Sequence, residues 1–191
     1  MPYCLIFFIS NMKLSFKYKT IVTAVVLSVF SLTFLSCSKL DNNYEPIHIS
    51  GLNIIHASPT LELLDVYVNN SRATEAEFEF GDKIGYLSAY SGNRTFNVTK
   101  RYSPVSLQSL QYTLEHQNAY SLFVVNKLEN VEFLMLEDDL TEPAAGNAKI
   151  RFINLSPDEG TLNLNVNGAT ADMVTDKASK EYSDFEEIEA A

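Results

Sequence analysis

The acidic run Glu137-Asp138-Asp139 is the part of the sequence best suited to hold a metal ion, and Glu142 follows close behind it. Calcium binds clustered carboxylate oxygens. The run lacks the alternating aspartate spacing of a calcium-binding loop, however, and it stands where a strand has to end before residues 141–147. We therefore expect Glu137, Asp138 and Asp139 to end a strand, with calcium binding as the alternative, and we predict no cofactor and no other metal site.

His56, Ser58 and Asp65 have the residue types of a hydrolytic triad and lie close together in the sequence. No Gly-x-Ser-x-Gly turn accompanies them, and such a turn is what exposes a serine nucleophile in many hydrolases. Asn154 replaces His56 in a second copy of the surrounding motif. The three histidines of the chain are also too widely spaced for a zinc site. We predict that the protein is not an enzyme.

Four tyrosines, Tyr86, Tyr90, Tyr102 and Tyr112, could stack on sugar rings if they gathered on one face. Tyrosines that alternate along strands more often fill the faces of a β-sandwich. An exposed cluster would favour carbohydrate binding, whereas scattered or buried tyrosines would favour a spacer or a protein contact. Carbohydrate binding is therefore the alternative function.

Cys37 ends a segment that is typical of an export signal. Residues 12–19 contain three lysines and no acidic residue. Residues 20–35 form an uncharged apolar run, and Ser36 precedes Cys37. The run is shorter than the roughly 20 residues of a membrane span. The pattern resembles the lipobox of bacterial lipoproteins, in which cleavage precedes the cysteine and the cysteine receives diacylglycerol. We expect a signal-peptide helix within residues 1–36 with translation starting at Met12, and a lipidated tether over residues 37–48; an uncleaved anchor is the alternative.

The composition favours a β-rich domain with an acidic surface. Apolar residues make up 46% of the 191 residues and aromatic residues 12%, with ten tyrosines and twelve phenylalanines. Such residues favour strands over long helices. The net charge is −10, and an acidic surface is repelled by nucleic-acid phosphates and anionic lipid headgroups. We predict no nucleic-acid partner and a membrane contact only through the lipid on Cys37.

From residue 49 onward the polar and apolar residues alternate as they do in half-buried strands. Leu64, Val66 and Val68 alternate with polar residues, and Phe78 and Phe80 alternate with glutamates. Seven or eight short strands separated by turns predict a two-layer antiparallel β-sandwich over residues 49–140. The predicted strands after the first are residues 64–68, 77–80, 84–90, 94–100, 105–114, 119–126 and 131–137.

The chain then starts again after a linker over residues 141–147. Residues 52–59 match residues 150–157, and residues 64–70 match residues 162–168 in the same register. The second copy, residues 148–191, lacks counterparts of the later strands of the first. Either the natural chain continues past Ala191, which we favour, or the half-repeat packs on the first domain or on another molecule.

These repeats, together with Leu136-Glu137-Asp138-Asp139-Leu140, resemble domain-of-unknown-function family 4397 from about Leu52 to the end. Its members are typically exported bacterial proteins with tandem Ig-like β domains, and many from the Bacteroidetes carry a lipoprotein leader. The resemblance implies an Ig-like sandwich at the cell envelope, on the periplasmic or surface side of the outer membrane, and no catalytic residues. We expect a non-enzymatic binding, adhesion or spacer domain with an envelope protein or a glycan as its partner.

Overall fold

The computed structural model describes residues 46–74, 77–158 and 160–190. The described residues belong to one compact unit, Pro46–Ala191. The predicted signal helix, its cleavage site, Cys37 and most of the tether therefore lie outside the described residues. In the part of the chain that is described, no helix has the length and apolar character needed to cross a membrane.

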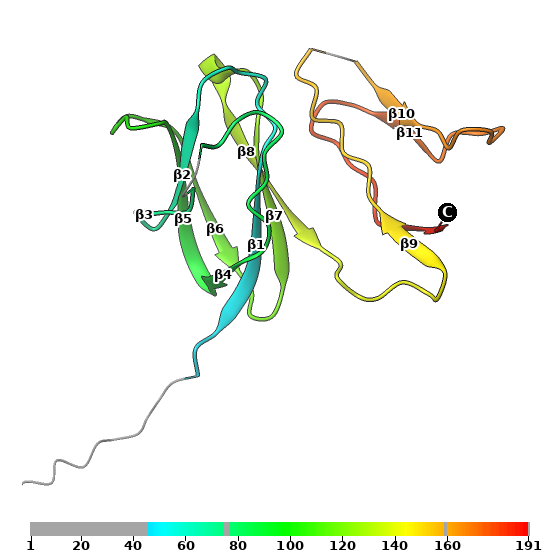
Figure 1. Ribbon diagram of the computed structural model, residues 1–191, viewed down its shortest axis with the longest axis horizontal. Helices are drawn as coiled ribbons and strands as arrows, with labels where there is room; N and C mark the ends of the chain where they lie inside the picture. Colours follow the sequence, from blue (N-terminus) through cyan, green and yellow to red (C-terminus); the bar gives the residue numbers. More distant parts are fainter. Residues whose placement is uncertain (1–45, 75–76, 159, 191) are drawn as a thin grey trace, which may run out of the picture. The chain divides into compact units, whose positions relative to one another are not determined.

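The first segment, residues 46–140, contains two four-stranded sheets (Figure 1). One sheet has the strand order β4-β1-β7-β8 and the other the order β3-β2-β5-β6. A 3-10 turn, Leu128–Asn130, precedes β8. The predicted all-β class is confirmed. The strand bounds are β1 Ile49–His56, β2 Leu64–Val68, β3 Ser71–Arg72, β4 Leu87–Tyr90, β5 Gly92–Lys100, β6 Ser106–Leu114, β7 Ala119–Val125 and β8 Glu132–Asp138.

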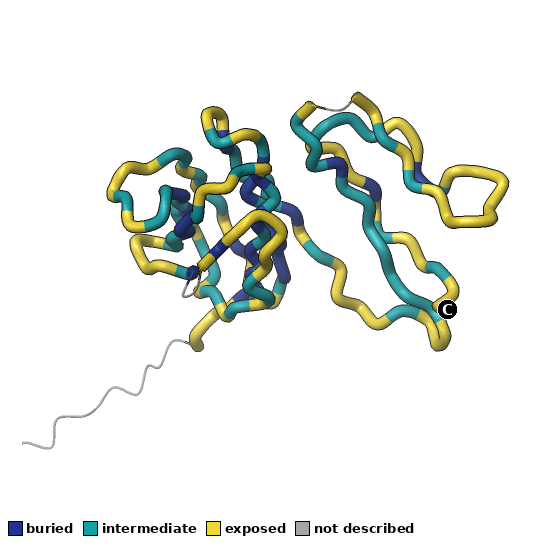
Figure 2. The backbone as a smooth tube through the Cα atoms, turned by 45° about the horizontal axis from the view of Figure 1, so that its top comes forward, coloured by how far each residue is buried: buried dark blue, intermediate teal, exposed yellow. Residues whose placement is uncertain are grey.

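Both sheets supply side chains to one hydrophobic core, which Figure 2 shows as the dark segments of the first segment. Along β1 every second residue is buried, as the alternating sequence predicts. Leu52 and Ile54 of β1 are 1% and 0% exposed, and they share the core with Val66 of β2 and Phe96 of β5. Each fully buried side chain of this kind contributes about 1.5–3 kcal/mol relative to an exposed one, so this core is what holds the two sheets together.

The sheet around β1 is not wholly antiparallel, and the sequence-based expectation is wrong on this point. β1 runs antiparallel to β4 but parallel to β7, with a register from Gly51 opposite Ala119 to His56 opposite Val124. Parallel neighbours need a long crossover connection. Here the chain crosses into the other sheet to form β5 and β6 before it returns as β7.

The predicted strand at residues 77–80 is also wrong, because this segment forms a turn against the end of β1. Phe78 is buried, whereas Phe80 is 60% exposed. Gly81 has a φ of +95° and donates from its backbone N to His56 O at 2.8 Å. Asp82 closes the turn, since its Oδ2 accepts a hydrogen bond from Glu79 N at 2.8 Å. The positive φ at Gly81, which most side chains disfavour, breaks the strand that the alternating pattern suggests.

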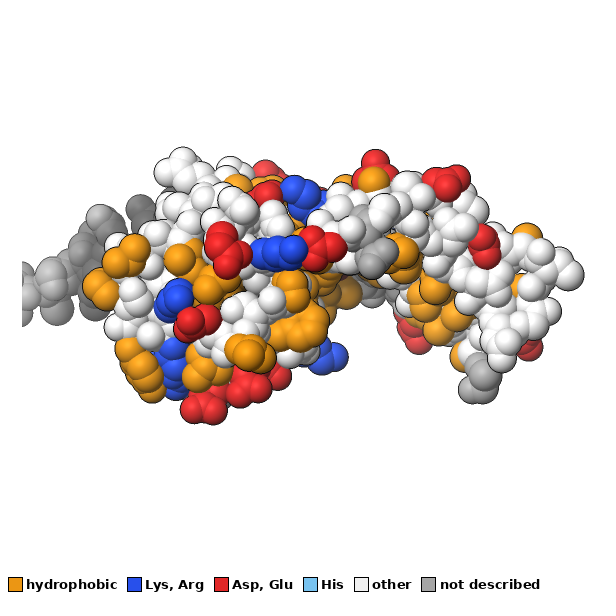
Figure 3. All heavy atoms as spheres, turned by 90° about the horizontal axis from the view of Figure 1, so that it is seen from above, with side chains coloured by type: hydrophobic (Ala, Val, Ile, Leu, Met, Phe, Trp, Pro, Cys, Tyr) orange, Lys and Arg blue, Asp and Glu red, His pale blue; other side chains and the backbone are white. Residues whose placement is uncertain are grey.

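The second segment, residues 141–190, is built from two two-stranded sheets, β12-β9 and β10-β11. Its strands are β9 Asn147–Ile150, β10 Leu162–Leu164, β11 Val174–Lys177 and β12 Glu186–Glu189. β8 ends at Asp138 and β9 begins at Asn147, so the connection covers the predicted linker. On the face seen in Figure 3, charged and apolar side chains are intermixed.

Candidate functional site

The candidate site is the junction between the two segments, and Asp138 at the end of β8 is its centre. The Asp138 carboxylate accepts hydrogen bonds from the Tyr86 hydroxyl at 2.8 Å and from the Ser121 hydroxyl at 2.6 Å, both at Oδ2. Its Oδ1 pairs with the Arg151 guanidinium of the second segment. The side chains of Asp138 and Arg151 are only 4% and 8% exposed. This is a buried ion pair with additional hydrogen bonds, the arrangement that lets a buried charge be tolerated.

Arg151 is fixed from several directions. Its Nη1 donates to the backbone O of Glu137 at 2.7 Å. Its guanidinium carbon lies 4.3 Å from the ring centroid of Phe185 and 6.0 Å from that of Tyr182. A guanidinium over an aromatic ring gains cation–π attraction, which strengthens when the pair is shielded from water. Arg151 therefore joins β8 of the first segment to the aromatic side chains that precede β12.

The pKa of Tyr86 is shifted by burial and by the Asp138 carboxylate at this junction. Burial is the main cause that raises the pKa of its hydroxyl to about 12, and the hydrogen bond to the Asp138 carboxylate adds to the shift. A neighbouring negative charge disfavours the phenolate, so the hydroxyl keeps its proton and remains a donor to Asp138.

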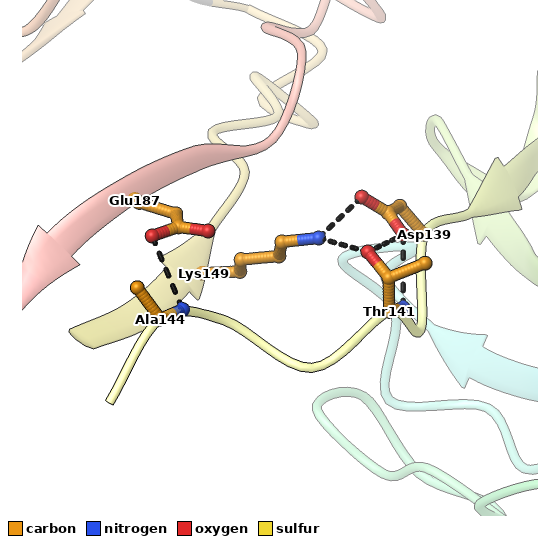
Figure 4. A network of polar contacts seen from close by, with 5 residues as sticks. All are labelled: Asp139, Thr141, Ala144, Lys149 and Glu187. Atoms are coloured by element: carbon orange, nitrogen blue, oxygen red, sulfur yellow. Dashed lines mark hydrogen bonds and ion pairs between the residues drawn. The ribbon is translucent and has the colours of Figure 1, made fainter. Parts of the chain in front are cut away.

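Asp139 and Lys149 form a second, more exposed contact between the linker and β9 (Figure 4). Lys149 Nζ donates to Asp139 Oδ2 at 2.6 Å and also contacts the Thr141 hydroxyl. Thr141 N donates to Asp139 Oδ1 at 2.9 Å. The hydrogen bond from Lys149 is the main cause that holds the pKa of Asp139 well below its usual range. Beside them, Glu187 of β12 accepts a hydrogen bond from Ala144 N at 3.3 Å.

The three carboxylates of the predicted calcium cluster point to different partners. Asp138 binds Arg151 and Asp139 binds Lys149, while Glu137 Oε1 accepts a hydrogen bond from Asn118 Nδ2 at 2.8 Å. They border a cavity of about 560 Å³. Among the described residues, no group of three or more histidine, cysteine, aspartate or glutamate side chains could hold a metal ion. The arrangement thus uses the acidic run to bind the cations of the second segment.

His56 and Ser58 are fully buried, and their polar side-chain atoms have no hydrogen-bond partner. The His56 ring packs 5.2 Å from that of Phe78. Burial lowers the pKa of His56, and the nearby Glu62 backbone and Asp82 charge offset this only in part. Asp65 instead accepts a hydrogen bond from the Thr74 hydroxyl at 3.1 Å. The three residues of the suggested triad are thus not linked by any hydrogen bond in the described structure.

The four tyrosines do not gather on one sheet face. Tyr86 and Tyr90 lie at β4, with the Tyr86 hydroxyl engaged by Asp138. Tyr112 of β6, in the other sheet, packs edge-on at 5.6 Å against the buried Tyr120. Tyr102, 79% exposed, lies in the turn after β5. These four tyrosines therefore do not form one exposed aromatic platform.

A comparison with protein families shows which family this chain belongs to. The family described as Domain of unknown function (DUF4397) matches residues 50–165. The chain belongs to this family. No curated protein matches the sequence. The DUF4397 match includes both sheets of the first segment and runs through β10, so Asp138 and Arg151 both lie inside it.

The sequence points to Asp138 but not to its partners. Its tyrosine pattern suggests only sugar stacking for Tyr86, and no motif marks Ser121 or Arg151 as a partner of Asp138. Arg151 carries a usable signal, because it is a charged residue inside the apolar run Ile150-Arg151-Phe152-Ile153. A charge in such a run is favoured only where it is paired.

Proposed function

We propose that this DUF4397 chain is an exported, lipid-anchored protein of the bacterial cell envelope, held at the outer membrane by diacylglycerol on Cys37. Its Ig-like β-sandwich acts as a non-enzymatic binding, adhesion or spacer module. The anchor is supported by the sequence alone, through the basic residues 12–19, the apolar run 20–35 and the small residue before Cys37. The protein would reach the membrane through this lipid, because its acidic surface does not favour anionic headgroups.

The observation that carries the module role is the buried pair between Asp138 and Arg151. A linker of eight residues lies between β8 and β9, and such a linker alone would leave the two segments free to reorient. The ion pair, the aromatic contacts of Arg151 and the Lys149–Asp139 contact oppose that motion. A stiffened joint suits a protein that holds a binding surface away from a membrane.

The experiment that tests the anchor compares the wild type with Cys37→Ala after expression in a bacterium that processes lipoproteins. The matched control is Ser36→Ala, which keeps a small residue before the cleavage site and leaves Cys37 in place. Wild type and the control should partition into detergent and show the mass of a diacylglyceryl chain starting at Cys37. Cys37→Ala should lose both properties. A wild-type protein that keeps its leader or lacks the lipid would overturn the anchor.

Carbohydrate binding has less support than a spacer or protein-binding role. The two most exposed of the four tyrosines, Tyr90 and Tyr102, are 64% and 79% exposed, but one belongs to β4 and the other to a turn. Sugar platforms need aromatic rings presented together. A glycan that binds the wild type and is lost in both Tyr90→Ala and Tyr102→Ala would favour the carbohydrate role instead.

A further inference from the structure

The turn of residues 78–82 is joined to the end of β1 by two backbone hydrogen bonds of His56. His56 N donates to Asp82 O and Gly81 N donates to His56 O, each at 2.8 Å. Phe78, the first residue of the turn, is 3% exposed, and its ring centroid lies 5.2 Å from that of His56. The His56 side chain is fully buried. The turn therefore helps to enclose this ring.

The second segment contains a matching turn, residues 177–181, beside a residue that does not titrate. Asn154 N donates to Glu181 O at 3.0 Å, and Lys180 N donates to Asn154 O at 2.6 Å. These bonds repeat the two backbone bonds of His56 at the residue that aligns with it. The chain thus contains its own comparison between a histidine and an asparagine at one position of the repeat.

The side chains at these two positions differ in their hydrogen bonds. Asn154 Nδ2 donates to Gly160 O at 3.2 Å and to Lys177 O at 2.9 Å, so the asparagine side chain also binds its turn. Neither ring nitrogen of His56 has a hydrogen-bond partner in the described structure. The first turn is therefore held by backbone bonds and by the packing of Phe78, and the polar atoms of the histidine ring add nothing to it.

The surroundings of the His56 ring favour its neutral form. Burial lowers the pKa of His56, and the Glu62 backbone and the Asp82 charge offset this only in part. The Glu62 carboxylate is itself paired with Lys100 at 2.9 Å, and β7, which pairs with the other edge of β1, has no acidic or basic residue. The other charged side chains of the neighbouring elements are exposed or bound elsewhere, namely Glu77, Glu79, Lys83, Asp65 and Lys127. A charged ring would have to reach water to be stabilised.

We propose that protonation of His56 opens the turn of residues 78–82 while both sheets stay folded, which makes this turn a pH-sensitive part of the first segment. A protonated ring has two N–H donors, and neither nitrogen has an acceptor while the turn is closed. The open turn lets the ring reach water and so binds the proton more tightly, and a proton favours the state that binds it better. Opening breaks a few backbone bonds and exposes one phenylalanine, which is the scale of a local unfolding event. The inference depends neither on the lipid anchor nor on a binding partner.

Opening also changes the surface at this end of the first segment. A hollow of about 540 Å³ lies between the turn and the loop after β1, lined by Pro59, Thr60, Leu61, Glu62, Glu79 and Phe80. Leu61 is fully exposed and Phe80 is 60% exposed. Because the hollow needs residues of both the turn and the loop, it exists only while the turn is closed, and opening exposes Phe78 in its place. The apolar surface there should therefore depend on pH.

Amide hydrogen exchange of the full chain in detergent tests this inference, with the second turn as an internal control. Exchange at Gly81 N–H measures opening of the first turn and exchange at Lys180 N–H that of the second, because each bonds to the residue at the matching position. From about pH 7.5 to about pH 5.5, after correction for intrinsic exchange rates, protection of Gly81 should fall severalfold, and at most about tenfold for an open-state pKa of about 6.5. Protection of Lys180 should stay constant, since Asn154 does not titrate and carboxylates remain charged in this range.

Three results of this measurement would overturn the inference. Equal losses of protection at Gly81 and Lys180 would assign the effect to a cause other than His56. A rise of protection at Gly81 would mean that the charged ring binds the closed turn as Asn154 does, which is the opposite of opening. Loss of protection in β5 over the same pH range would show that the sheets unfold together with the turn.

His56→Asn places the residue of the second turn in the first and should make protection of Gly81 independent of pH. His116→Asn is the matched control, because it removes an exposed histidine and should leave the loss of protection in place. Circular dichroism checks that both variants fold. The wild-type His56 ring, followed by NMR, needs no variant and should titrate with the same midpoint as the protection of Gly81. A pH dependence that persists in folded His56→Asn, or two different midpoints, would contradict the role of His56.

Discussion

Asp138 and Arg151 form an ion pair with side chains that are 4% and 8% exposed, although they belong to two segments joined by an otherwise exposed linker. Taking both charges out of water is costly, and the pair is tolerated because Tyr86 and Ser121 also donate to Asp138. Removing one charge should therefore cost more than removing both.

We expect Asp138→Asn to destabilise the protein by about 3 kcal/mol, since it leaves the Arg151 charge buried without its partner. Replacing both residues together, Asp138→Leu with Arg151→Met, should cost clearly less. Urea unfolding of Asp138→Asn and of the double variant measures the difference. The control is Lys180→Gln, which breaks the exposed pair with Glu132 and should cost no more than about 1 kcal/mol. Equal losses for Asp138→Asn and Lys180→Gln would contradict a buried clamp.

His56 should make the first segment sensitive to acid. Its folded pKa is lowered because it is buried, so the fold retains the neutral ring. Stability is then full above the unfolded pKa of about 6.5 and declines as the pH falls through it toward the folded pKa, by at most about 1.4 kcal/mol per pH unit. Urea midpoints at about pH 7.5 and about pH 5, which lie above and below the ordinary histidine pKa, measure this decline.

The second segment suggests a substitution that removes the acid sensitivity caused by His56. Asn154 stands at the matching position and donates from Nδ2 to Gly160 O at 3.2 Å and to Lys177 O at 2.9 Å. We expect His56→Asn to fold and to lose the part of the acid sensitivity that comes from His56. His116→Asn changes an exposed histidine and should leave that sensitivity in place. An unchanged pH dependence in His56→Asn would show that other groups cause it.

The alternation of residues predicts the strands of the core but not the direction in which they pair. Leu64, Val66 and Val68 fall on β2 as expected, since one face of the strand must be buried. The parallel pairing of β1 with β7 depends on a crossover through the other sheet, which no local pattern encodes. The turn at Phe78 follows from backbone hydrogen bonds to His56 and Leu64, again between residues far apart in the sequence.

The sequence predicts the acidic run of the candidate site but not its partners, because these also come from residues that meet only in the folded chain. A run of carboxylates at a strand end can be solvated or can bind cations, and the sequence does not say whether a cation there is a metal ion or a side chain. Arg151 and Lys149 come from the second segment and meet the run only after the linker has turned the chain back. The partners thus depend on the packing of two segments.

Asp139 should titrate at an unusually low pH because Lys149 donates to its carboxylate. A depressed folded pKa gives stability above the unfolded pKa, and this stability is lost as the pH falls through the folded one. We expect Lys149→Gln to raise the pKa of Asp139 toward its ordinary value, as followed by NMR of the side-chain carboxyl carbon. Lys127→Gln, which frees Asp158 instead, is the control. An Asp139 pKa that does not respond to Lys149→Gln would place the cause elsewhere.

Calcium should not stabilise the protein through Glu137, Asp138 and Asp139. Calcium needs six to eight oxygen ligands, and to bind here it would have to displace the Arg151 guanidinium from Asp138 and the Lys149 ammonium from Asp139. We expect the same unfolding temperature in millimolar calcium and in excess chelator. The variant Lys149→Gln with Arg151→Gln frees both carboxylates and is the informative comparison, since it should gain calcium sensitivity if the cations are what excludes the metal. A rise in unfolding temperature with calcium in the wild type would restore the calcium site as the role of this acidic run.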